Sequence, residues 1–159
     1  MMETRPSLTL VSTYPVPVQR VWAAWTEPEQ LGRWFGPDGG PVLHAETDVR
    51  PGGRFRIAFQ SEDGEHHTCL GEYGEVVPQQ RLVFSWEWIT MPERRSHVAL
   101  TFRETATGTE LTLHHSQFFD HSARDRHHEG WSGALEKLGR MLVAHAAAGS
   151  RGASEFQNS

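Results

Sequence analysis

Ten histidines are the residues of this sequence best suited to acid–base or metal chemistry, and six of them form adjacent pairs. The pairs are His66-His67, His114-His115 and His127-His128. Neighbouring side chains point to opposite faces of a strand, so the first two pairs, which lie in candidate strands, cannot each chelate one ion. No His-x-His or His-Glu-x-x-His pattern accompanies them. We therefore expect no metal site and no cofactor.

Two of these histidines fall on faces that should be buried. His115 alternates with Leu111 and Leu113 along a strand, so it would point inward, as a polar contact in a pocket or as an acid or base near neutral pH. His127 lies on the apolar stripe of a C-terminal helix. Either would alternatively be a core-edge histidine with its hydrogen bonds satisfied, and we interpret His127 in that way.

Large aromatic side chains offer a second kind of chemistry, which is the binding of a flat or aliphatic molecule. Several of them recur on the expected inward faces together with large aliphatic side chains. The candidate pocket residues are Trp34, Phe35, Phe55, Phe59, Trp86, Trp88, His115, Trp131, Leu135, Leu138 and Met141. The alternative is that these side chains simply fill the core, since large aromatics dominate core burial in general.

Nucleophilic catalysis finds little support in the sequence. Cys69 is the single cysteine and has no local histidine motif beyond the pair that precedes it, and no Gly-x-Ser-x-Gly pattern occurs. Glu72 and Glu75 would lie on opposite faces of a regular strand, so they do not form an acid–base pair. We therefore name no catalytic residue.

One long helix is expected to position much of this chemistry, over Ser122–Ala148. At about 100° per residue, its Trp131, Leu135 and Leu138 fall on one arc, with charged residues opposite. Ser122 and the aspartate three residues later predict a capping-box start, and Gly149 predicts the stop.

Short strands and two short helices are expected upstream of that helix. A strand over Ser7–Tyr14 precedes helices at Pro17–Thr26 and from Pro28 onward. Period-two alternation then predicts six strands, at Leu43–Val49, Arg54–Gln60, His66–Val77, Arg81–Trp88, Ser96–Glu104 and Glu110–Phe118. Gly71 and Gly74 suggest a bulge or bend in the third of these, and Ile89–Arg94 is expected to be a loop. Short turns favour an antiparallel sheet.

Composition limits the class of protein. With 159 residues, 37% of them hydrophobic, and a net charge of −5, the chain fits one globular domain over residues 1–149, followed by a small polar tail over 150–159 that should be disordered. The mild acidity argues against nucleic-acid binding. We expect no membrane span, no secretory signal and no disulfide, which together favour a cytoplasmic location.

Six segments in order resemble a known family. They are Val21–Thr26 with Pro28, Trp34–Pro37, Asp48–Phe55, Gly71–Pro78 with Arg81–Trp86, Gly108–Leu113, and His128–Trp131 leading into Leu135 and Leu138. The chain resembles the START-like (SRPBCC) superfamily and, within it, bacterial proteins similar to the C-terminal domain of the heat-shock chaperone ATPase activator. The resemblance implies an α+β helix-grip fold, in which a curved antiparallel sheet of about seven strands wraps around the long C-terminal helix.

The resemblance also narrows the function. It implies a pocket between sheet and helix for a small hydrophobic molecule, with Trp34 and Phe35 at the entrance. Two alternatives stay open, because one fold can host several activities. The first is a cyclase- or hydrolase-like enzyme that uses His115 or a pocket glutamate, and the second is a module that stimulates a chaperone ATPase. We also expect a homodimer, because the family often pairs and Gly133 faces away from the sheet.

Overall fold

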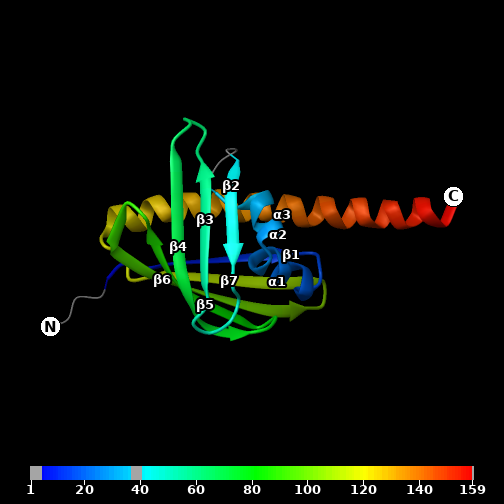
Figure 1. The fold of residues 1–159 in the computed structure, drawn as a ribbon. Coiled ribbons are helices and arrows are strands. Elements are labelled where there is room, and N and C mark those ends of the chain that lie inside the picture. Colours follow the sequence, from blue (N-terminus) through cyan, green and yellow to red (C-terminus); the bar gives the residue numbers. More distant parts are fainter. Residues whose placement is uncertain (1–4, 37–40, 159) are drawn as a thin grey trace.

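The computed structural model describes residues 5–36 and 41–158, with the side chains up to Ala144. The chain forms one seven-stranded antiparallel sheet that bends around a long C-terminal helix (Figure 1). The elements follow the order β1 (Leu8–Tyr14), α1 (Val18–Thr26), α2 (Pro28–Trp34), β2 (Val42–Thr47), β3 (Arg54–Gln60), β4 (His66–Val77), β5 (Arg81–Trp88), β6 (Met91–Thr105), β7 (Gly108–Ser116) and α3 (His121–Asn158). The predicted α+β helix-grip fold is confirmed.

The strand order in the sheet is β1-β7-β6-β5-β4-β3-β2. Strands β2 to β7 therefore form a meander, in which each strand pairs with the next one along the chain. The first strand closes against the last, with Leu10 opposite Leu113. This pairing brings the N-terminal strand beside helix α3, so the two ends of the described fold share one core.

The core lies between the sheet and helix α3. Inward-facing positions alternate along the strands, as the period-two pattern predicts, and Leu82, Leu100 and Leu113 have no exposed surface. Helix α3 contributes one buried stripe that includes Trp131 and Leu138. The predicted inward faces of strands and helix are therefore confirmed.

The two short helices cover one end of this core. The indole N–H of Trp34 in α2 donates to the backbone oxygen of Ala24 in α1 at 2.9 Å. The rings of Trp25 and Trp34 lie 4.7 Å apart in an edge-on arrangement. These contacts fix α1 against α2 and set the position of the segment that follows α2.

Strand β4 contains the irregularity that its glycines predict. Its pairing with β5 shifts register between Tyr73 and Glu75, which is a bulge at Gly74. Gly71 has a different role, because a Cβ there would lie 1.9 Å from the backbone oxygen of Ser85. The absence of a side chain at Gly71 lets β4 and β5 approach each other.

The predicted loop over Ile89–Arg94 is wrong. Only Ile89 and Thr90 form the turn, and β6 begins at Met91, which pairs with Trp88 after a register shift. This register shift lies between Trp86 and Trp88, and no local pattern in the sequence predicts it. As a consequence, Arg94 belongs to a strand, on the same face as Ser96.

The expected ends of the long helix also need correction. Asp120 caps α3, because its Oδ1 accepts a hydrogen bond from the backbone N–H of Ala123 at 2.8 Å. The hydroxyl of Ser122, the predicted cap, instead accepts from the guanidinium of Arg126 at 3.0 Å. The helix continues past Gly149 to Asn158. Disorder of the tail over residues 150–159 stays a prediction.

Candidate functional site

A cavity of about 720 Å³ lies between the sheet and the first turns of helix α3. The end of α2 supplies one wall, strands β3 to β6 supply a second, and α3 with the segment before it supplies a third. The lining aromatic side chains are Phe35, Phe59, Trp86, Trp88, Phe118, Phe119 and Trp131. Exposed Ile89 and Phe119 mark the side that opens to solvent. The volume lies within the range of about 300–1,000 Å³ that is typical of small-molecule sites.

Five of the eleven candidate pocket residues border this cavity. They are Phe35, Phe59, Trp86, Trp88 and Trp131. Trp86 is the central one, because its ring lies 5.5 Å from that of Trp88 and 5.1 Å from that of Trp131. The aromatic rings from the sheet and from the helix therefore meet at one wall.

The other six candidates lie elsewhere in the core. Trp34 is 1% exposed and bonded to α1, so it does not stand at the entrance. Phe55 packs edge-on against Phe84 at 5.2 Å. The remaining four are His115, Leu135, Leu138 and Met141, and none of them borders the cavity. Leu135 and Leu138 are buried, and the cavity lies nearer the start of α3.

His115 sits behind the cavity wall with both ring nitrogens satisfied. The indole N–H of Trp131 donates to His115 Nδ1 at 3.0 Å, so that nitrogen carries a lone pair. Nε2 therefore carries the proton and donates to the hydroxyl of Ser96 at 2.7 Å. Burial lowers the pKa of His115 well below its usual value, and nearby His127 adds to the effect. These two hydrogen bonds and the burial keep His115 neutral, and its side chain packs in the core without bordering the cavity.

His127 has the opposite tautomer and lies on the cavity surface. The indole N–H of Trp88 donates to His127 Nε2 at 3.0 Å, so the proton is on Nδ1, which donates to the backbone oxygen of Ala123 at 2.8 Å. Burial also lowers the pKa of His127. His127 is thus a satisfied histidine, as interpreted from the sequence, and in addition it borders the cavity.

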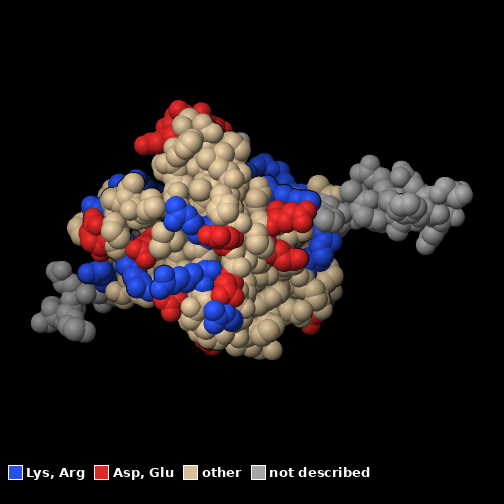
Figure 2. Space-filling model, viewed as in Figure 1, with Lys and Arg blue, Asp and Glu red and all other residues tan. Residues whose placement is uncertain are grey.

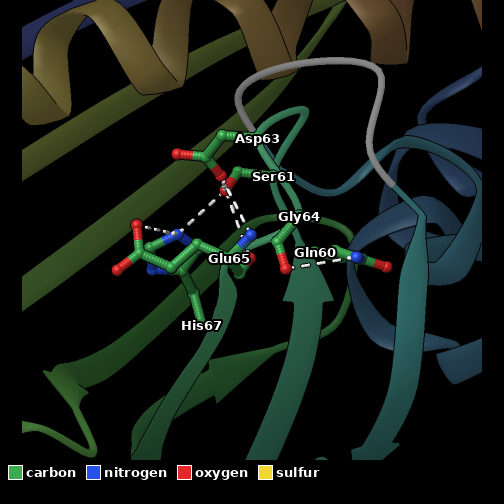
Figure 3. A network of polar contacts seen from close by, with 6 residues as sticks. All are labelled: Gln60, Ser61, Asp63, Gly64, Glu65 and His67. Carbon is green, nitrogen blue, oxygen red and sulfur yellow. Dashed lines mark hydrogen bonds and ion pairs between the residues drawn. The ribbon is translucent and has the colours of Figure 1, made fainter.

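The turn between β3 and β4 places a serine, a histidine and two carboxylates close together (Figure 3). The Ser61 hydroxyl lies 2.5 Å from Asp63 Oδ1 and 3.2 Å from His67 Nε2. Glu65 also approaches Nε2 of His67, at 3.9 Å. A catalytic triad instead needs the acid on Nδ1 and a serine proton directed to the histidine.

This network therefore stabilises the turn. Asp63 Oδ1 accepts from the Ser61 hydroxyl and from the backbone N–H of Glu65, and these bonds lower the pKa of Asp63. Gln60 closes the opposite side by donating to the backbone oxygen of Gly64 at 3.2 Å. Figure 2 shows acidic side chains gathered at this tip, where Glu62, Asp63 and Glu65 lie.

The cavity rim carries charges of both signs. Arg94 of β6 and Arg126 of α3 border the cavity, as do Glu65 and Glu129. Arg94 is half-buried, and its guanidinium carbon lies 4.1 Å from the centre of the Phe119 ring. The other three charged side chains are exposed. Arg94 is therefore the charge most closely associated with the apolar lining.

Metal ligands do not gather anywhere in the part of the chain that the structure describes. No group of three or more His, Cys, Asp or Glu side chains is placed there to hold an ion. Cys69 is fully buried in β4, and burial raises the pKa of its thiol, so the reactive thiolate is disfavoured. Within residues 5–36 and 41–158, no helix is long and apolar enough to cross a membrane.

The sequence patterns did not identify several of the residues that line the cavity. Arg94 and Met91 fell in the expected loop, although alternation backward from Ser96 would have placed Arg94 on the inward face. Phe118 was the expected end of the strand Glu110–Phe118, but β7 ends at Ser116 and is followed by Gln117 with a left-handed φ of 66°. Phe118 and Phe119 therefore lie between β7 and α3. His67 was considered only as a member of the adjacent pair His66-His67 and not as a pocket residue, yet it borders the cavity and stacks on Phe59 at 5.3 Å.

Comparisons with known proteins agree with this architecture. Residues 15–143 match the sequence model of the family described as "Activator of Hsp90 ATPase homolog 1-like protein". No protein of curated function matches the chain.

Three solved bacterial structures show the similarity. Protein NE0264 from Nitrosomonas europaea is 26% identical, with a TM-score of 0.77 over 92% of this chain and 99% of that one. The AHSA1 protein SPO3351 from Silicibacter pomeroyi is 27% identical, with a TM-score of 0.77 over 88% and 99%. Protein Ms6760 from Mycobacterium smegmatis is 26% identical, with a TM-score of 0.74 over 86% and 90%.

Proposed function

The chain belongs to the Activator of Hsp90 ATPase homolog 1-like family, in the START-like superfamily, and from that premise we propose that it binds a small hydrophobic molecule between sheet and helix. The observation that carries this proposal is the cavity of about 720 Å³ with seven aromatic side chains in its lining. A cavity of this size and composition suits a flat or aliphatic ligand.

The ligand would lie among Trp86, Trp88 and Trp131. Trp88 and Trp131 have their N–H groups committed to His127 and His115, so they offer ring surface to a ligand rather than hydrogen bonds. A flat ring system would gain burial and edge-on or stacked aromatic contacts there. Recognition would thus depend mainly on shape and apolar contact.

The enzyme alternative named His115 or a pocket glutamate, and the cavity borders Glu65 and Glu129 but not His115. His115 does not border the cavity, and both of its nitrogens already have partners. An acid–base group must come within hydrogen-bonding reach of the atom that it protonates or deprotonates. Glu65 and Glu129 are exposed at the rim, away from the apolar lining, so we favour binding over catalysis as the function of this cavity.

Filling the cavity should abolish ligand binding. Ala134 of α3 is 3% exposed and borders the cavity, so Ala134→Phe would place a ring in the space that the ligand needs. With N-phenylnaphthylamine, a neutral dye that fluoresces in apolar surroundings, we expect the affinity to fall at least about tenfold. Fluorescence titration measures this, and circular dichroism checks that the variant is folded.

The matched control is Ser132→Phe, which adds the same ring two residues away on the same helix. Ser132 is exposed and does not border the cavity, so its replacement should leave the affinity unchanged. Equal affinities for the wild-type protein and both variants would show that the dye binds outside the cavity, and would overturn the proposal.

Stimulation of a chaperone ATPase is the second candidate function, and the family description favours it. It requires a protein-binding surface rather than the cavity. An increase in the chaperone's ATPase rate that Ala134→Phe does not change would support this candidate. A cytoplasmic location and a homodimer remain part of the proposal.

A further inference from the structure

Among the Asp, Glu, Lys and Arg side chains that line the cavity in the described part of the chain, Arg94 is the one that is partly buried. The indole Nε1 of Trp86 also has no hydrogen-bond partner, but this nitrogen is fully buried, so a ligand in the cavity does not reach it. A guanidinium can only donate hydrogen bonds, so a ligand that pairs with Arg94 must supply acceptor atoms.

Arg94 is an uncompensated charge at an apolar wall. Within the part of the chain that the structure describes, Arg94 takes part in no ion pair and no hydrogen bond. Its guanidinium makes a cation–π contact with the face of the Phe119 ring. Arg94 is partly buried and its guanidinium has no counter-ion among the described residues, so pairing with an anion would be favourable.

The other rim charges are in a different situation. Arg126 donates to Ser122, and Glu65 lies near His67. Glu65 and Glu129 are exposed, so water solvates their carboxylates. The positive charge of Arg94 is thus more buried than the negative charges of Glu65 and Glu129, and this difference favours an anionic ligand over a cationic one.

We propose that the ligand is an aromatic or similarly flat apolar molecule with an anionic oxygen group, such as a carboxylate or sulfonate. Arg94 binds the anion at the mouth of the cavity, and the apolar body lies against Trp86 and Trp131. This inference rests on the proposed function and adds the charge of the ligand to it.

Two dyes that differ by one sulfonate test the inference. N-phenylnaphthylamine is neutral, and anilinonaphthalene sulfonate has the same ring system with an anionic group. The wild-type protein should bind the sulfonate more tightly. Arg94→Met keeps an apolar stem and removes the charge, so it should weaken sulfonate binding about tenfold or more and weaken binding of the neutral dye much less.

Arg95→Met is the matched control. Arg95 is the next residue of β6, is exposed, and does not border the cavity, so its replacement removes the same charge outside the site. It should leave the affinity for both dyes within about twofold of wild type, because exposed charges act weakly through solvent.

The outcomes separate the two claims. If Arg94→Met and Arg95→Met affect the sulfonate equally, or if the neutral dye binds more tightly, the anion claim is overturned while binding in the cavity survives. If neither dye responds to Ala134→Phe, the proposed function itself fails. A selective loss of sulfonate affinity in Arg94→Met supports both claims.

Discussion

His115 and His127 are both neutral, and each is held so by an indole N–H that donates to its lone pair. Protonation of either ring would place an N–H against another N–H. Their rings lie 5.2 Å apart, so a charge on one also disfavours a charge on the other. The cavity wall is therefore built for the neutral form of both side chains.

We predict that stability decreases at mildly acidic pH. Folding lowers the pKa of both histidines below the value of about 6.5 expected in the unfolded chain, so below that pH the unfolded chain binds protons that the folded chain does not. The free energy of unfolding should be about 1–3 kcal/mol lower near pH 5.5 than near pH 7.5. Urea unfolding followed by tryptophan fluorescence measures the difference.

A variant assigns the effect to the histidines. His127→Gln keeps an amide that can accept from Trp88 but does not titrate, so it should lose less stability between the two pH values. Carboxylates with a lowered pKa, such as Asp63 and Glu110, act only near and below about pH 4 to 5, outside this window. Equal unfolding free energies at both pH values in the wild-type protein would contradict the prediction.

Among the elements, strand β4 shows how two glycines in one strand can have different physical roles. Gly71 lies against β5, where a Cβ would meet the Ser85 backbone oxygen at 1.9 Å and the Phe55 ring at 2.6 Å. Gly74 lies at the bulge, where the nearest atom to a Cβ would be the Val83 oxygen at 3.9 Å. Only the first position requires the absence of a side chain.

We therefore predict that Gly71→Ala destabilises the protein by more than about 2 kcal/mol, because the β4 and β5 backbones must separate. Gly74→Ala has room for the methyl group and should change the unfolding free energy by less than about 0.5 kcal/mol. Urea midpoints of the two variants give the comparison. A similar loss in both would mean that close approach at Gly71 is not the cause.

At the scale of the whole molecule, the sheet has two open edges, β1 and β2. Each carries an exposed apolar side chain, Val11 at 59% and Leu43 at 49%. An edge strand presents unpaired backbone groups that can pair with another chain, and exposed apolar side chains strengthen such an association. The fold thus offers two surfaces through which a second copy of the chain could pair.

We predict a homodimer formed through one of these edges. Light scattering should give the mass of two chains, because edge pairing buries Val11 or Leu43 together with unpaired backbone groups. Val11→Lys and Leu43→Lys identify the edge, since only the variant at the interface should give a monomer. A wild-type mass of one chain would refute the prediction.

The local patterns of the sequence determine the elements and their inward faces. Alternation along Phe55, Ile57 and Phe59 predicts a half-buried strand, and the stripe of Trp131, Leu135 and Leu138 predicts an amphipathic helix. Both are confirmed, because periodicity depends only on backbone geometry within one element. The fold follows from seven such strands and one helix long enough to cover them.

Only the tertiary structure decides where the core contains a cavity and which polar side chains lack a hydrogen-bond partner. Leu135 and Leu138 share a face with Trp131, yet the cavity adjoins only Trp131, because the contacts that fill or leave a gap come from distant segments. Both ring nitrogens of His115 are hydrogen-bonded, to Ser96 and to Trp131, which come near it only in the folded chain. Arg94 belongs to a strand because β6 begins at Met91, which pairs with Trp88 after a register shift between Trp86 and Trp88.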